Sequence, residues 1–259
     1  MNYTVISTEN RGSVGIITLK RPEALNAVNR QMLEELAGAV AAFEADDTVA
    51  VLVLRGSDKA FAAGIDVKEL YAHMEHAVEL DMELSRFFAE LRNCRKPIIA
   101  AVAGYALGIG CQLALACDIV LAADNARFGQ PEVSLSVVPG FGAAATLTRI
   151  LGRPKAMEMI LTGKALNAED AERAGLVSRI VPLPDLFEES VRVAMRIAAQ
   201  PRIAVLSAKE AVREAENLGF DSAAAYENKL LHLNMLSDDF KESLRAFNEK
   251  RPPNLKNRL

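Results

Sequence analysis

Apolar residues follow two different periods along the first 180 residues of the chain, and the two periods alternate. Short continuous apolar runs, rich in β-branched residues, predict buried strands, whereas apolar residues three and four positions apart predict helices that bury one face. The predicted strands are Val14–Leu19, Val49–Leu54, Ile98–Val102, Asp118–Ala122 and Val177–Val181. The predicted helices carry Met32, Leu36, Val40 and Phe43; Leu80, Leu84, Phe87 and Leu91; and a stretch capped by Asn167 and closed by Gly175. Continuous apolar strands between helices predict an α/β fold with a mainly parallel sheet that is covered on both faces.

Beyond residue 182 the pattern is helical only. An amphipathic stretch from Asp185 to Ala199 predicts one helix, apolar positions between Tyr226 and Leu233 predict another, and Ser237 is placed to cap a last one. We therefore divide the chain into an α/β core, residues 1–182, and a helical C-terminal region, residues 183–259. We expect some apolar faces of these helices to need a partner subunit for cover, which indicates an oligomer.

Composition and charge narrow the class of protein. The chain has 259 residues, of which 51% are hydrophobic and 25% charged, and these proportions exclude a disordered chain. A net charge of −4 argues against nucleic acid as a partner. Three cysteines, an odd number, suit free thiols in a reducing compartment, and the first ten residues lack the basic and apolar regions of a signal peptide. We therefore expect a cytoplasmic protein.

One segment has the length of a membrane span. Residues 98–117 carry no charge, but they contain three glycines, many alanines and Gln112. They are better interpreted as a buried strand to Val102, a glycine-rich turn and a helix from Gly110. We therefore predict no membrane association.

Small residues gather in four segments that suit a ligand site. These are 59–70 (KAFAAGIDVKEL), 104–112 (GYALGIGCQ), 128–132 (FGQPE) and 138–142 (VPGFG). Small residues between a strand and a helix let a ligand approach the backbone and leave helix N–H groups unpaired. Two such turns that face one another would place two donors on one oxygen, as in an oxyanion hole. Ordinary turns and close helix–sheet packing explain the same glycines, so the pattern by itself leaves both interpretations open.

Taken together and in order, the motifs resemble the enoyl-CoA hydratase/isomerase (crotonase) superfamily over nearly the whole chain. The matching stretches are 21–27 (RPEALNA), Ala63–Asp66, 104–112, 129–132 (GQPE), 161–164 (LTGK) and 174–177 (AGLV). The resemblance implies a crotonase-like superhelix of ββα units, and a helical C-terminal region that forms a homotrimer or a dimer of trimers. It also implies an acyl-CoA substrate, with no separate cofactor and no metal, since coenzyme A is part of that substrate.

The resemblance also assigns the binding positions. It implies that the thioester oxygen lies between the backbone N–H groups of Ile65 and Ile109, where the family usually has smaller residues. The positions that correspond to the coenzyme A and substrate contacts are Ala24, Leu25, Lys59, Ala63, Asp66, Val67, Lys68 and Gly140. Lys59 and Lys68 are candidate phosphate partners, although both are equally explained as surface lysines. We expect Asp66 to act mainly as the cap of a helix that starts near Val67.

The catalytic positions depart from the hydratase pattern. Hydratases that the chain resembles carry one glutamate at the Gln112 position and another at the Glu132 position. A neutral amide orients water but does not accept its proton at neutral pH. Glu132 corresponds to the single base of enoyl-CoA isomerases in this superfamily, so we favour double-bond isomerisation. The alternatives are a hydratase with Gln112 in place of one glutamate, and a member that binds acyl-CoA with weak or no catalysis.

Two further groups of side chains carry other hypotheses. Glu69, His73 and His76 have a spacing that can bind zinc, but we favour a solvated helix face, because the chain has only one other histidine and no cysteine near them. Cys111 precedes Gln112 near the start of a predicted helix, where a thiol pKa can fall, but no histidine is near it in sequence and we favour a buried small hydrophobic residue.

Overall fold

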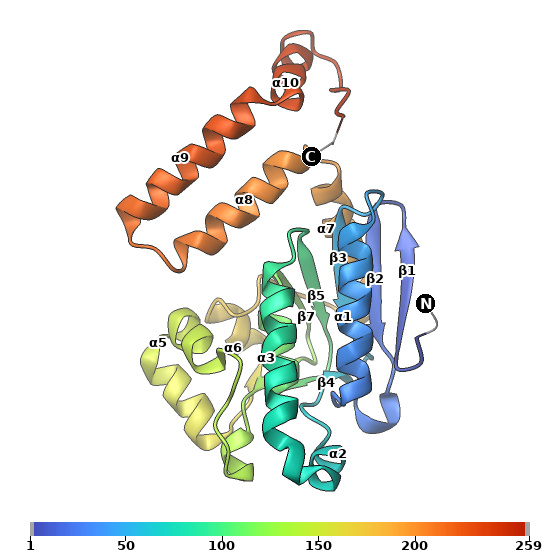
Figure 1. The fold of residues 1–259 in the computed structure, drawn as a ribbon, viewed down its shortest axis with the longest axis vertical. Helices are drawn as coiled ribbons and strands as arrows, with labels where there is room; N and C mark the ends of the chain where they lie inside the picture. Colours follow the sequence, from blue (N-terminus) through green and yellow to red (C-terminus); the bar gives the residue numbers. More distant parts are fainter. Residues whose placement is uncertain (1–2, 257–259) are drawn as a thin grey trace.

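The core is a six-stranded, mainly parallel sheet (Figure 1). The computed structural model describes residues 3–256. The strand order is β1-β2-β3-β5-β7-β10, and every neighbouring pair is parallel except β1 with β2. These strands are β1 (Ile6–Arg11), β2 (Val14–Leu19), β3 (Val51–Arg55), β5 (Ile98–Val102), β7 (Ile119–Ala123) and β10 (Arg179–Val181).

A second, four-stranded sheet has the order β4-β6-β8-β9. Its strands are short: β4 (Ala60–Ala62), β6 (Tyr105–Leu107), β8 (Arg127–Gly129) and β9 (Leu166–Asn167). The core strands β3, β5 and β7 are each followed by one strand of this sheet and then by helix. The chain therefore repeats a ββα unit, which is the predicted superhelix.

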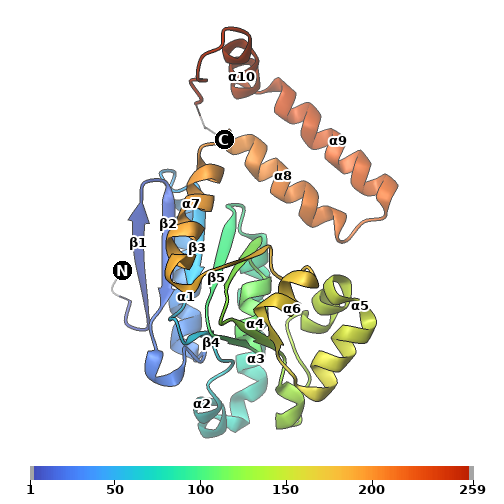
Figure 2. The same ribbon diagram turned by 180° about the vertical axis from the view of Figure 1, so that it is seen from behind.

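Helices cover both faces of the core sheet. Alternate side chains of a strand point to opposite faces, so Leu52 and Ile98 pack with helices α1 and α3, whereas Val53 and Ile99 pack with α7. Figure 1 shows α1 and α3 on the near face, and Figure 2 shows α7 on the other. The helices of the core are α1 (Arg30–Ala45), α2 (Val67–Ala72), α3 (Ala77–Asn93), α4 (Ile109–Leu115), α5 (Ala143–Thr162), α6 (Ala168–Arg173) and α7 (Leu186–Ala198).

The last three helices form an arm that projects from the core (Figure 2). They are α8 (Arg202–Ala215), α9 (Phe220–Leu236) and α10 (Asp238–Asn248). The predicted helical region 183–259 therefore begins with a helix of the core, since α7 buries Leu186, Val191 and Ala194 against the sheet. Lys209 of α8 ties the arm down, because its Nζ donates to Asp118 Oδ2 at 2.8 Å and to the carbonyl oxygen of Lys96 at 2.9 Å.

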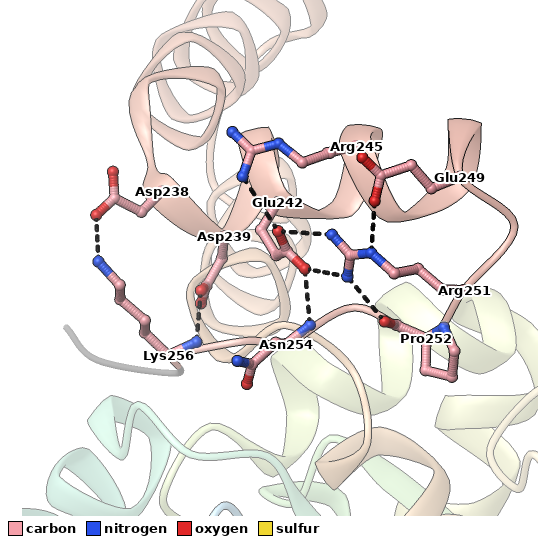
Figure 3. A network of polar contacts seen from close by, with 9 residues as sticks. All are labelled: Asp238, Asp239, Glu242, Arg245, Glu249, Arg251, Pro252, Asn254 and Lys256. Carbon is pink, nitrogen blue, oxygen red and sulfur yellow. Dashed lines mark hydrogen bonds and ion pairs between the residues drawn. The ribbon is translucent and has the colours of Figure 1, made fainter.

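A polar network folds the C-terminal segment back onto α10 (Figure 3). Glu242 accepts from both terminal nitrogens of Arg251, at 2.6 and 3.2 Å, and from the backbone N–H of Asn254 at 2.9 Å. The backbone N–H of Lys256 donates to Asp239 at 2.7 Å. Side chains of α10 thus supply acceptors to a segment that has no regular secondary structure of its own.

Several elements agree with the predictions from sequence. The strands Val14–Leu19 and Ile98–Val102 have the predicted ends, and Asn167 and Ser237 cap the helices that follow them. The uncharged residues 98–117 form β5, β6 and α4. Among residues 3–256, no helix combines the length and apolar character needed to cross a bilayer.

Candidate active site

The two glycine-rich turns that follow β4 and β6 meet at Gly108. β4 and β6 are parallel neighbours, so the turns after them leave the small sheet at the same edge. A Cβ on Gly108 would lie 3.8 Å from Gly64 Cα and 2.9 Å from Glu132 Oε1. Gly108 has φ 51° and ψ −124°, a conformation that a residue with a side chain rarely adopts. A glycine is therefore required where both turns and the Glu132 carboxylate converge.

Close packing of α4 fixes the second turn. A Cβ on Gly110 would lie 1.9 Å from the carbonyl oxygen of Ala62, so the start of α4 rests directly on the backbone of β4. The side chain of Ile109 is buried in the core on the α1 and α3 side, and Ile65 packs against the same core. The Ile109 side chain is therefore buried, and the Ile65 side chain is partly buried against the same core.

The N–H groups of Ile65 and Ile109 are left without backbone acceptors. Val28 forms an isolated β-bridge with Ile65. In this bridge Val28 N–H donates to the carbonyl oxygen of Gly64 at 2.8 Å, and Asp66 N–H donates to the carbonyl oxygen of Val28 at 2.9 Å. Neither hydrogen bond uses the N–H of Ile65. Ile109 is the first residue of α4, where an N–H has no acceptor within the helix. Among residues 3–256, no hydrogen bond is donated by the N–H of Ile65 or the N–H of Ile109. Two unpaired donors on adjacent turns are the arrangement that an oxyanion hole needs.

Glu132 is the ionisable group at this point. It opens the 3-10 helix η3 (Glu132–Leu135) after Pro131, and its side chain is half-buried. Burial raises the pKa of the Glu132 carboxyl group above its ordinary value. A carboxylate with a raised pKa next to unpaired donors is suited to accept and return a proton.

Gln130 is a second contact to Glu132 that the sequence did not single out. It is fully buried, and the orientation of its amide that satisfies both ends places Nε2 2.9 Å from Oε1 and 3.1 Å from Oε2 of Glu132. It lies two residues before Glu132 in the motif 129–132, directly after β8, so a polar residue next to a buried strand was the available signal.

Gln112 lies deeper, in the middle of α4. Its side chain is 3% exposed, and its Nε2 donates to the carbonyl oxygen of Phe141 at 2.9 Å. Its Oε1 is a buried acceptor without a hydrogen-bond partner among the residues that the structure describes. No hydrogen bond joins Gln112 to Glu132 within that part of the chain. The buried amide therefore has one end fixed and presents the other as an acceptor.

The loop that contains Ala24 and Leu25 lies against the first glycine turn. The carbonyl oxygen of Leu25 accepts from Ala63 N at 3.1 Å. Asn26, which is fully buried and was not singled out from sequence, donates its Nδ2 to the carbonyl oxygen of Ala60 at 2.9 Å. The structure thus brings together two of the segments that were assigned to coenzyme A.

Asp66 caps α2, as predicted from sequence. Its carboxylate accepts from the N–H groups of Lys68 at 3.1 Å and Glu69 at 3.3 Å, and it pairs with Arg21 at 2.8 Å. Burial by itself raises the pKa of Asp66, but the Arg21 and helix N–H contacts outweigh it and lower that pKa overall. The Asp66 side chain therefore has a structural role: it accepts hydrogen bonds from the start of α2 and from Arg21, which precedes the loop that contains Ala24 and Leu25.

The remaining assigned positions lie at the surface around these loops. Lys59, Val67 and Lys68 are exposed, and a Cβ on Gly140 would meet open space. Burial raises the pKa of the Cys111 thiol to about 12, so this thiol is not activated. Within residues 3–256, no three His, Cys, Asp or Glu side chains are arranged to hold a metal ion, and His76 instead contacts Glu79 at 3.0 Å.

Comparisons with known proteins show the family to which the chain belongs. The sequence profile of the enoyl-CoA hydratase/isomerase family matches residues 9–258. A probable enoyl-CoA hydratase of Mycobacterium leprae is 45% identical, and the 2,3-dehydroadipyl-CoA hydratase of Escherichia coli is 38% identical, each over the full length of both chains. The crystal structure of an enoyl-CoA hydratase from Bacillus anthracis superposes with a TM-score of 0.94 at 32% identity, covering 98% of this chain and 100% of that one.

The fold and the family match define a crotonase-type protein. The chain belongs to the enoyl-CoA hydratase/isomerase family, whose members act on acyl-CoA thioesters. It is therefore an enzyme of the hydratase or isomerase kind, and the resemblance seen in its sequence motifs is confirmed.

Proposed function

We propose that this enzyme shifts the double bond of an enoyl-CoA, with Glu132 as its only proton-transfer group. The proposal rests on the difference between residues 112 and 132, the two positions at which the hydratases of the family carry glutamates. Glu132 is an ionisable carboxylate with a raised pKa, whereas the group at the other position is the neutral amide of Gln112. A reaction that needs one base is served by this pair, and a reaction that needs an acid and a base together is not.

The steps balance with one carboxylate. The thioester oxygen of a 3-enoyl-CoA accepts hydrogen bonds from the N–H groups of Ile65 and Ile109, which polarises the carbonyl. Glu132 removes a proton from Cα, and the electron pair moves onto the thioester oxygen to give a dienolate. The protonated Glu132 then delivers the same proton to Cγ, the double bond forms between Cα and Cβ, and Glu132 becomes a carboxylate again.

The lysines near the loops fit the coenzyme A portion of this substrate. We assign Lys59 and Lys68, both exposed, as point charges for its phosphates. Ala24, Leu25, Ala63, Val67 and Gly140 line the approach in the same proposal, and no cofactor beyond the substrate is required.

A spectrophotometric assay tests the proposal. The conjugated thioester of a 2-enoyl-CoA absorbs, and a 3-enoyl-CoA lacks that conjugation. Incubation with a 3-enoyl-CoA is expected to produce the absorbance, and incubation with a 2-enoyl-CoA is expected to leave most of it. Rapid loss of absorbance from the 2-enoyl-CoA, with none gained from the 3-enoyl-CoA, would reverse the assignment.

Hydration is the second candidate, because the relatives above are named as hydratases. In that case Gln112 Oε1, the buried acceptor, orients a water molecule while Glu132 supplies the proton transfer. The same assay separates the two reactions.

We also propose that the arm mediates assembly into a homotrimer or a dimer of trimers. Large apolar side chains on the arm are exposed, among them Phe220 at 86%, Leu236 at 73% and Phe247 at 82%. Apolar surface of this kind on a projecting element favours cover by another subunit. Light scattering during size-exclusion chromatography is expected to give a mass of three or six chains, and a monomer would contradict the proposal.

A further inference from the structure

The carbonyl oxygen of Phe141 is held from two sides. Gln112 Nε2 of α4 donates to it at 2.9 Å, and Arg92 Nη1 of α3 donates to it at 3.2 Å. Phe141 has φ 55°, and it lies between two glycines, of which Gly142 has φ 89°. A left-handed conformation is unfavourable for a residue with a side chain, so this loop depends on contacts from outside it.

Helix α3 holds the ring of Phe141 as well as its carbonyl. The ring stacks on Phe88 with centroids 5.1 Å apart and planes inclined by 16°. Phe88 and Arg92 are four residues apart on α3, so they lie on the same face of the helix. One face of α3 therefore fixes both the direction of the ring and the direction of the carbonyl.

The direction of that carbonyl decides how Gln112 is presented. A primary amide carries a donor end and an acceptor end that differ little in shape. Because Phe141 O takes the Nε2 end, Oε1 is the end that remains unpaired in the buried interior. If the Phe141 carbonyl pointed elsewhere, the hydrogen bond to Nε2 would be lost. The Gln112 amide could then rotate by 180° and present its N–H donor in place of Oε1.

Arg92 reaches this carbonyl from outside the site. Its side chain lines a groove of about 870 Å³ between the core and α8, and its own carbonyl oxygen accepts from Arg213 of α8 at 3.2 Å. Arg92 thus lies between the arm and the loop that contains Phe141, and no hydrogen bond or ion pair joins it to Glu132 within residues 3–256.

We propose that Arg92 is a positioning residue, which holds the Phe141 carbonyl and through it sets the orientation of the Gln112 amide. The inference rests on the proposed function for its effect on catalysis. Its effect on the loop is independent of that function.

The kinetic test compares Arg92→Ala and Arg92→Lys with Arg86→Ala, an exposed arginine on the same helix. We expect Arg92→Ala to lower kcat by about tenfold with little change in the KM for the enoyl-CoA, because misplaced groups lose rate more than binding. Lysine still donates one hydrogen bond, so Arg92→Lys is expected to recover part of the loss. Arg86→Ala is expected to match the wild type.

A double-mutant cycle tests the route through Gln112. In a Gln112→Ala background, Arg92→Ala is expected to cost at most about twofold, since the amide that it orients is absent. The same loss of kcat in both backgrounds would overturn the proposed route.

Hydrogen exchange gives a readout that does not depend on activity. We expect the backbone amides of residues 137–142 to exchange faster in Arg92→Ala than in the wild type or in Arg86→Ala. Unchanged exchange in the folded Arg92→Ala variant would overturn the proposal. If wild-type enzyme turned over neither enoyl-CoA while exchange rose as expected, the proposed function would fail and the hold of Arg92 on the loop would stand.

Discussion

Gln130 and Glu132 face each other across Pro131, with the Gln130 amide nitrogen within 2.9 Å of Oε1 and 3.1 Å of Oε2 of the carboxylate. Burial of Glu132 favours its protonated form and raises its pKa, whereas an N–H donated to both oxygens favours the charged form. Burial therefore raises the pKa of Glu132, and it is opposed by the backbone N–H of Glu132 and by the fully buried amide of Gln130.

The first prediction concerns pH. Glu132 accepts a proton only as the carboxylate, so kcat/KM should fall with decreasing pH through a pKa that lies above the ordinary 4.5. Gln130→Leu removes the donor, and we expect it to move this acidic limb to higher pH. A pH–rate profile measures the shift, with the exposed Gln200→Leu as the control. Superimposable limbs for Gln130→Leu and wild type would show that the amide does not act on Glu132.

The second prediction removes the base. Glu132→Gln keeps the size of the side chain but leaves no group to accept the Cα proton. We expect turnover to fall by about 100-fold or more, while the affinity for coenzyme A measured by calorimetry stays nearly unchanged. Near-normal turnover would take Glu132 out of the mechanism.

The third prediction restores a carboxylate at the other family position. We expect Gln112→Glu to increase hydration of a short 2-enoyl-CoA by about 10-fold, because a second base becomes available. The carboxylate that this substitution introduces has, when ionised, no proton to donate to the Phe141 carbonyl, which Gln112 contacts at 2.9 Å. The variant should therefore also melt at a lower temperature than the wild type. If the folded variant binds the thioester and hydration does not rise, Gln112 is not what separates this enzyme from a hydratase.

The fourth prediction places a methyl group where the turns meet. Gly108→Ala brings a Cβ to 2.9 Å from Glu132 Oε1, so we expect it to displace the carboxylate and to reduce turnover by at least about tenfold. Gly175→Ala is the matched control, since Gly175 also has positive φ but has no neighbour within 4 Å of an added Cβ. Gly175→Ala should cost about 1–2 kcal/mol of stability and Gly108→Ala at least as much, measured by denaturant unfolding. Equal loss of turnover in the two variants would assign the effect to stability alone.

The fifth prediction concerns the C-terminal segment shown in Figure 3. The Arg251 hydrogen bonds lower the pKa of Glu242 to about 2, so the ionised clamp is present above pH 4.5 and is lost as the pH falls toward 2. At neutral pH, Glu242→Gln should increase hydrogen exchange in residues 250–256. Glu249→Gln, which removes only one exposed ion pair with Arg251, should have a smaller effect. Equal exchange in Glu242→Gln and wild type would show that the clamp does not hold the segment.

Elements with a regular apolar period were predictable, and those whose period is broken were not. The strand Ile98–Val102 is buried on every residue, and its apolar run shows this directly. The pattern missed β1, whose apolar positions are sparse, and the strands of the small sheet, which have only two or three residues each. It also did not single out α8, although apolar residues recur along that helix. It also missed Ala143–Thr162, because Gly152, with φ 73°, and Pro154 interrupt the helical spacing of α5.

The sequence alone determined the family and the chemical identity of the groups at positions 112 and 132, because both are carried by residue type and by the order of the motifs along the chain. The ββα order was expected only through the resemblance to that family. Only the tertiary structure decided which groups meet. Three contacts show this: the Gln130 amide with the Glu132 carboxylate, the Arg92 and Gln112 side chains with the Phe141 carbonyl oxygen, and the position of Gly108 between Gly64 and Glu132. Each contact joins different elements or depends on how the chain turns. Contacts of this kind arise from close packing and from the pairing of buried polar groups, and neither leaves a period in the sequence.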